Sequence, residues 1–105
     1  MIPMLIMKDI VKSIREELKD VKKYADLAAK VKPSDPQLAR TYAELGGAEV
    51  THVDKLHKAA VDLINKYTAS GKEIPPAMKS IWEFEHQMMI EELADAKRIL
   101  ELANM

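Results

Sequence analysis

Apolar residues recur at steps of three and four residues in three segments of the chain, and this spacing places side chains on one face of an α-helix. The segments run from about residue 4 to 30, from 36 to 67–69 and from 76 to 103. Both connections contain residues that end helices: 33–36 reads Pro-Ser-Asp-Pro, and 71–76 holds one glycine and two prolines. Short turns between long helices predict an all-α, up-down-up antiparallel three-helix bundle.

Polar residues interrupt the predicted inward stripe of each segment. Glu17 lies in the first stripe, Glu49 and His52 in the second, and His86 in the third, with Glu83 one turn before it. An unpaired carboxylate or imidazole is costly to bury, so these residues need a partner or a metal ion. The apolar members of the first two stripes are Met7, Ile10, Ile14, Val21, Tyr24, Ala28 and Val31, then Leu38, Tyr42, Leu45, Leu56, Ala59 and Leu63.

Counting along the helices predicts which polar residues meet. Glu17 and His52 are equally far from the turn at 34–35, so Glu17, Glu49 and His52 should share one layer. A Glu and a His three residues apart point the same way and can ligate metal. Carboxylates and imidazole without thiolate suit iron or manganese more than structural zinc.

The third segment fits this layer less directly. Its position level with His52 is near Leu93, roughly 10 Å beyond His86 at the rise of a helix. Three arrangements stay open: the 70–75 connection doubles back, His86 meets a site in a second subunit, or Glu92 is the third-helix ligand.

Three motifs resemble a known family. They are Ala39-x-x-Tyr42-x-x-Leu45-x-x-x-Glu49-x-x-His52-x-x-x-Leu56, Glu17-x-x-Asp20-x-x-x-Tyr24 and Glu83-x-x-His86. In this order they resemble the second, first and last helices of the ferritin-like superfamily, the rubrerythrins especially. The resemblance implies a ferritin-like fold and a non-haem di-iron or di-manganese site with Glu17, Glu49, His52, Glu83 and His86 as ligands. It also implies reaction with O2 or peroxide by a ferroxidase- or peroxidase-type oxidoreductase.

The chain departs from this family in two ways. The family has four helices, and its third helix supplies a Glu for which this chain has no separate helix. The chain has no cysteine, so it lacks the rubredoxin-like module that rubrerythrins carry. The alternative function is a non-catalytic interaction module or assembly subunit, whose buried Glu and His residues form a metal-free hydrogen-bonded network.

Composition sets the remaining expectations. A length of 105 residues predicts a single domain over 1–105, and a net charge of −1 argues against a nucleic-acid partner. No apolar run approaches the roughly 20 residues of a membrane span, and residues 1–7 read as the start of a helix. We therefore expect a cytoplasmic protein without a membrane partner. His57 is expected at the surface, and Gly46 and Gly47 indicate either close helix packing or a local widening of the helix.

A homo-oligomer is also expected. Three helices leave one side of a four-helix enclosure uncovered, and Ile81, Met88 and Ile99 offer apolar surface beyond one seam. A two-fold dimer would cover this side together with part of the Glu17 layer. It would also bring Glu83, His86 or Glu92 of a second copy to the site.

Overall fold

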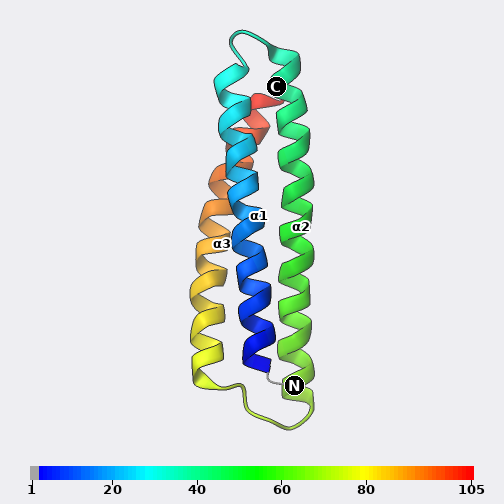
Figure 1. The fold of residues 1–105 in the computed structure, drawn as a ribbon, viewed down its shortest axis with the longest axis vertical. Coiled ribbons are helices and arrows are strands. Elements are labelled where there is room, and N and C mark those ends of the chain that lie inside the picture. The colour runs from blue at the N-terminus through cyan, green and yellow to red at the C-terminus, as the bar shows by residue number, and fades with distance from the viewer. Residues whose placement is uncertain (1–2) are drawn as a thin grey trace.

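Three long helices make up the part of the chain that the computed structural model describes, residues 3–105. They are α1 (Pro3–Val31), α2 (Pro36–Ala69) and α3 (Pro76–Ala103), and no strand occurs within that range. α1 rises, α2 descends and α3 rises again, in a rod of 56 × 18 × 18 Å (Figure 1). The all-α, up-down-up arrangement predicted from the apolar spacing is confirmed. Residues 1–2, which were expected to lead into the first helix, lie outside the described range.

The ends of α2 follow from local chemistry. The Asp35 carboxylate accepts a hydrogen bond from the backbone N–H of Leu38 at 3.0 Å, and Pro36 occupies the first helical position. At the other end Gly71 has a φ of 82°, a left-handed conformation that glycine adopts without steric cost. Both ends are those that the sequence predicts.

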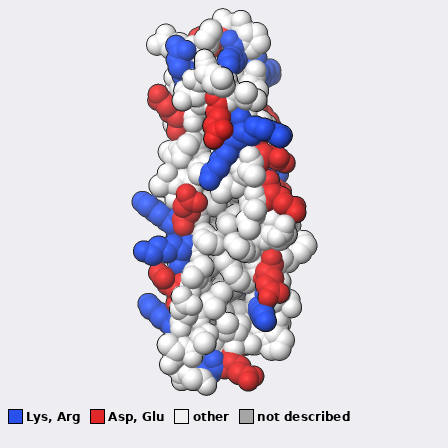
Figure 2. Space-filling view, turned by 180° about the vertical axis from the view of Figure 1, so that it is seen from behind, with Lys and Arg blue, Asp and Glu red and all other residues white. Residues whose placement is uncertain are grey.

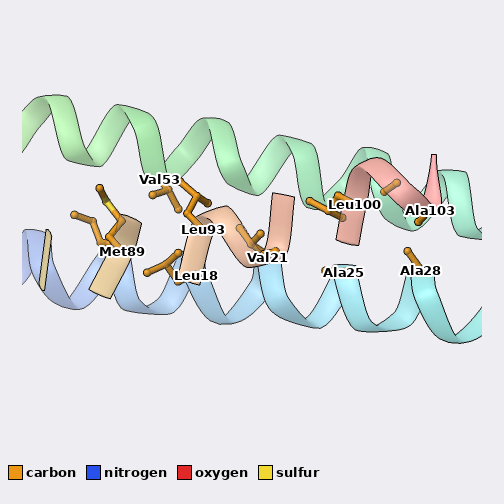
Figure 3. Close-up of a cluster of buried hydrophobic side chains, with 12 residues drawn as sticks. Leu18, Val21, Ala25, Ala28, Val53, Met89, Leu93, Leu100 and Ala103 are labelled. Atoms are coloured by element: carbon orange, nitrogen blue, oxygen red, sulfur yellow. The ribbon is translucent and has the colours of Figure 1, made fainter. Parts of the chain in front are cut away.

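The core is built around α1, whose buried residues alternate steps of four and three. A large cluster fills the middle of the bundle and the end that carries the α1–α2 turn (Figure 3). A smaller cluster, Met7, Val11, Ala60 and Met78, lies toward the α2–α3 turn. The buried residues of α1 are Met7, Val11, Ile14, Leu18, Val21, Ala25 and Ala28.

The predicted inward stripe of α2 is wrong by about one residue of rotation. Leu38 and Leu45 are exposed, and the buried residues are Ala39, Ala43, Gly46, Val53 and Ala60. Small side chains let the helix backbones approach closely, so α2 turns its small residues inward and leaves the larger ones at the edges. Glu49 and His52 consequently lie at the edge of the α1–α2 contact, not in its centre.

The two adjacent glycines of α2 have different surroundings. A Cβ built at Gly46 would lie 2.6 Å from Leu100 Cδ2 and 3.3 Å from Tyr24 Cβ, whereas one built at Gly47 meets nothing within 4 Å. Gly46 therefore serves close packing of the three helices. Gly47 serves no packing contact.

This difference gives a matched pair of substitutions. Gly47→Ala should raise the free energy of unfolding by about 1 kcal/mol, because alanine is the better helix former. Gly46→Ala should lower it by about 1 kcal/mol, because the displacement of Leu100 outweighs the same gain. Urea unfolding followed by circular dichroism measures both. Equal shifts in the two variants would contradict close packing at Gly46.

The third helix runs straight up the bundle from the 70–75 connection (Figure 1). Leu93 and Val53 belong to the same core cluster and lie level with each other (Figure 3). The connection therefore does not double back, and the first of the three open arrangements is excluded. On the side opposite to the view of Figure 1, a broad uncharged band lies between charged side chains (Figure 2).

No helix among the described residues combines the length and apolar character that crossing a membrane requires.

Candidate metal centre

Three predicted ligands meet where α1 and α2 pack. Glu17 comes from α1, and Glu49 and His52 come from successive turns of α2. The Nδ1 atom of His52 lies 3.2 Å from Glu49 Oε2 and 3.4 Å from Glu17 Oε2. One ligand atom from each residue lies within 4.8 Å of the others. The structure thus brings together the three residues that counting from the α1–α2 turn places in one layer.

The Glu17 carboxyl has unusual electrostatics. Its Oε2 atom is buried and makes no hydrogen bond within the described residues. The pKa of Glu17 is raised above its ordinary value, first by hydrogen bonding with the Glu49 carboxyl, then by burial and by the negative charge of Glu49. His52 opposes this shift. A cation beside the two carboxyl groups would favour the ionised form of Glu17 and so oppose this shift.

The cluster is open on one side. The His52 side chain is 50% exposed, while Glu17 and Glu49 are half-buried. Val21, one helical turn after Glu17, and Val53, one turn after Glu49, are completely buried. The inner side of the cluster is therefore apolar, and its outer side faces solvent.

The donor set fits a divalent metal. Carboxylate oxygens and imidazole nitrogens bind first-row metals at about 2.0–2.2 Å, so two ligands on one ion lie up to ~4.2 Å apart. The ligand atoms lie within 4.8 Å of one another, so metal binding would need them to move only slightly closer. The buried Glu17 Oε2 makes no hydrogen bond with any described residue, so it is an available ligand atom.

The structure does not bring Glu83, His86 or Glu92 to this cluster. The Glu83 side chain is 64% exposed and lies 3.9 Å from the Nζ atom of Lys79. The Glu92 carboxylate lies 3.1 Å from the Nζ atom of Lys22, on the α1–α3 side. His86 packs with His57 and Trp82, with ring centroids 5.0 Å and 5.3 Å away.

Sequence reasoning missed two partly or fully buried polar residues. His57 is half-buried, not at the surface as predicted, and burial followed by the charge of His86 lowers its pKa, against the opposing effect of Asp54. Glu85 is 5% exposed and pairs with Arg15. Their spacing from core residues could have indicated this burial. His57 lies four residues after Val53, and Glu85 lies four residues before Met89; Val53 and Met89 are both buried.

The raised pKa of Glu17 predicts a pH dependence of stability in metal-free protein. Between the ordinary pKa of 4.5 and the raised one, the folded chain holds a proton that the unfolded chain has released. The stability that this proton contributes is full below pH 4.5 and is lost as pH rises through the raised pKa. Glu17→Gln should remove this loss, as measured by urea unfolding in chelator across pH 4–8.

Glu16→Gln, at an exposed carboxylate next to Glu17, is the matched control. It should reproduce the wild-type pH profile. Identical profiles for wild type and Glu17→Gln would show that Glu17 does not hold the proton.

The chain has no match among protein-family models, curated proteins or solved structures. Its function is therefore argued from the cluster itself and from the motif resemblance in its three helices.

Proposed function

We propose that this protein binds iron, or alternatively manganese, as a non-haem carboxylate metalloprotein of ferritin or rubrerythrin type. One observation supports this most directly: Glu17, Glu49 and His52 converge from two helices, and one Glu17 oxygen is buried without a hydrogen bond in the part of the chain that the structure describes. Two carboxylates this close repel each other when both are ionised. A +2 ion would stabilise both ionised forms and accept the imidazole lone pair of His52.

Bound iron would supply one-electron chemistry with O2 or peroxide, which is the ferroxidase- or peroxidase-type activity that the motif resemblance implies. The chain's own residues have simpler tasks. Glu17 and Glu49 would hold the ion as carboxylates, so metal binding would compete with protonation of Glu17, whose pKa is raised. His52 would hold the ion through an unprotonated nitrogen of its imidazole ring. The buried side chains of Val21 and Val53 keep water from the inner side of the site.

A homo-oligomer belongs to the same proposal. Three protein ligands do not complete the coordination of one iron or manganese ion, and a second ion would need further carboxylates. The outer side of the cluster faces solvent, as the exposure of His52 shows. Water or a second copy of the chain would supply the remaining ligands. The uncharged band on the other side of the bundle is additional surface that a partner could cover (Figure 2).

The competing function is a metal-free interaction module. It is favoured by the contacts of His52 Nδ1 with both carboxylates, which already offset part of their repulsion. In this case the cluster would be a polar network that fixes how the helices pair.

Metal retention distinguishes the two functions. Protein purified with chelator is loaded anaerobically with Fe2+, and in parallel with Mn2+, then desalted and assayed for metal. We expect about one ion per chain to remain bound, because three ligands held together by two packed helices act jointly on one ion. The interaction module retains no metal. Loss of all iron and manganese on desalting would contradict the proposed function.

A further inference from the structure

A groove runs between α1 and α3. It lies on the opposite side of α1 from the Glu17–Glu49–His52 cluster. Arg15 lines this groove, and Glu17, two positions later, is turned by about 160° around the helix. Three consecutive hollows follow the groove along the bundle, with volumes of about 560, 200 and 320 Å³. Nothing in the proposed metal function uses this surface.

The two ends of the groove have opposite charge. The hollow nearest the start of α1 is lined by three basic side chains and one carboxylate, namely Lys8, Lys12, Arg15 and Glu85. The hollow at the other end is lined by one lysine and three carboxylates, namely Lys22, Asp26, Glu92 and Asp95. The charge pattern of one end is thus the inverse of the other.

Apolar side chains of α3 line the groove between these charges. Phe84 is 61% exposed at the basic end, beside the half-buried Ile81. Met88 lines the middle hollow, and Ile99 lines the acidic end. Exposed aromatic and apolar residues with charged residues around them are typical of protein interfaces.

We infer that this groove is an interface with a second copy of the chain, in antiparallel orientation. A two-fold axis near Met88, in the middle hollow, would reverse the groove and lay each basic end on the partner's acidic end. A parallel pairing would oppose like charges. The charged stretch from Lys8 to Asp26 is about 27 Å long. Because the axis lies in its middle, the two-fold symmetry forms the same complementary contact at both ends of this stretch.

Charge reversal tests this pairing in chelator, where metal cannot contribute. Wild type should have about twice the chain mass of 11.9 kDa by light scattering at ~100 µM. At this concentration even an interface with a dissociation constant in the low micromolar range is mostly formed. Lys8→Glu/Lys12→Glu makes both ends acidic, and Asp26→Lys/Asp95→Lys makes both ends basic. Each variant alone should be monomeric. An equimolar mixture of the two should recover the dimer mass, because both contacts are then complementary.

A control variant and a rescue variant accompany this experiment. Lys58→Glu/Lys66→Glu, on exposed positions of α2, is the matched control and should keep the wild-type mass. Combining all four groove substitutions in one chain restores self-complementarity and should restore the homodimer. Circular dichroism verifies that every variant is helical.

Several results would overturn the inference. They are a monomeric wild type, reversal variants that keep the dimer mass, or a mixture that stays monomeric. A wild type that is monomeric in chelator and dimerises when metal is added, with or without the charge reversals, would place the interface at the Glu17–Glu49–His52 cluster instead. The inference is independent of the proposed function, because metal retention and assembly in chelator are separate measurements.

Discussion

If the protein binds metal as proposed, replacing His52 with alanine is expected to abolish the stabilisation that the metal gives to the folded state. Metal bound only by the folded state raises the free energy of unfolding by about 2.7 kcal/mol at a concentration 100 times the dissociation constant. For a domain of this size that corresponds to roughly 10 °C or more in Tm. Glu49→Ala should have the same effect, because both residues are ligands in the proposed site. Calorimetry with and without Mn2+ measures the shift.

Variants on α3 serve as controls. Glu83→Ala removes a carboxylate that is mostly exposed and lies beside Lys79, so it should leave the metal-induced shift intact. His86→Ala should do the same, since His86 packs with His57 and Trp82, away from the cluster. Loss of the shift in either control would bring α3 into the site. An unchanged shift in His52→Ala and Glu49→Ala would indicate adventitious surface binding.

The helix ends and the meeting of Glu17 with His52 could be predicted from the sequence, because both depend on local residues or on counting along a helix. Capping by Asp35 and the positive φ of Gly71 depend on residues adjacent in the chain, so both ends of α2 could be predicted. The meeting of Glu17 with His52 follows from counting equal numbers of residues on either side of a short turn. Neither inference needs knowledge of how the helices rotate about their axes.

Rotation of α2 could not be predicted in this way. Two adjacent stripes compete on that helix, one containing Leu38 and Leu45 and the other Ala39 and Gly46. Side-chain hydrophobicity favours the first stripe, but close packing requires the second, because a Cβ built at Gly46 would lie only 2.6 Å from Leu100 Cδ2. The error also placed Glu49 and His52 too deep. They lie at an edge, where water lowers the cost of their charges.

The second large effect concerns the salt bridge between Arg15 on α1 and Glu85 on α3. Arg15 Nε donates to Glu85 Oε2 at 2.9 Å, and an Nη atom of Arg15 donates to the other carboxylate oxygen. Glu85 is 5% exposed, whereas the Arg15 side chain is 56% exposed. The carboxylate therefore depends on this partner much more than the guanidinium does.

That asymmetry predicts unequal effects for the two single substitutions. Arg15→Met leaves a buried carboxylate unpaired and should lower the free energy of unfolding by about 2–3 kcal/mol, less than for a fully buried pair because water reaches Arg15. Glu85→Met removes the buried charge, returns Arg15 to water and should cost under about 1 kcal/mol. The double variant should be close to Glu85→Met, which gives a large coupling energy.

Self-association must not enter this measurement, since Arg15 also lines the groove proposed as an interface. The cycle is therefore measured by urea unfolding in the Asp26→Lys/Asp95→Lys background, whose substitutions lie at the other end of the groove. If Glu85→Met costs as much as Arg15→Met, the carboxylate stabilises the fold through contacts other than Arg15. If Arg15→Met costs under about 0.5 kcal/mol, the value of an ordinary surface substitution, water solvates Glu85 without its partner. The expected asymmetry follows from burial alone: the residue that cannot reach water is the one whose partner matters.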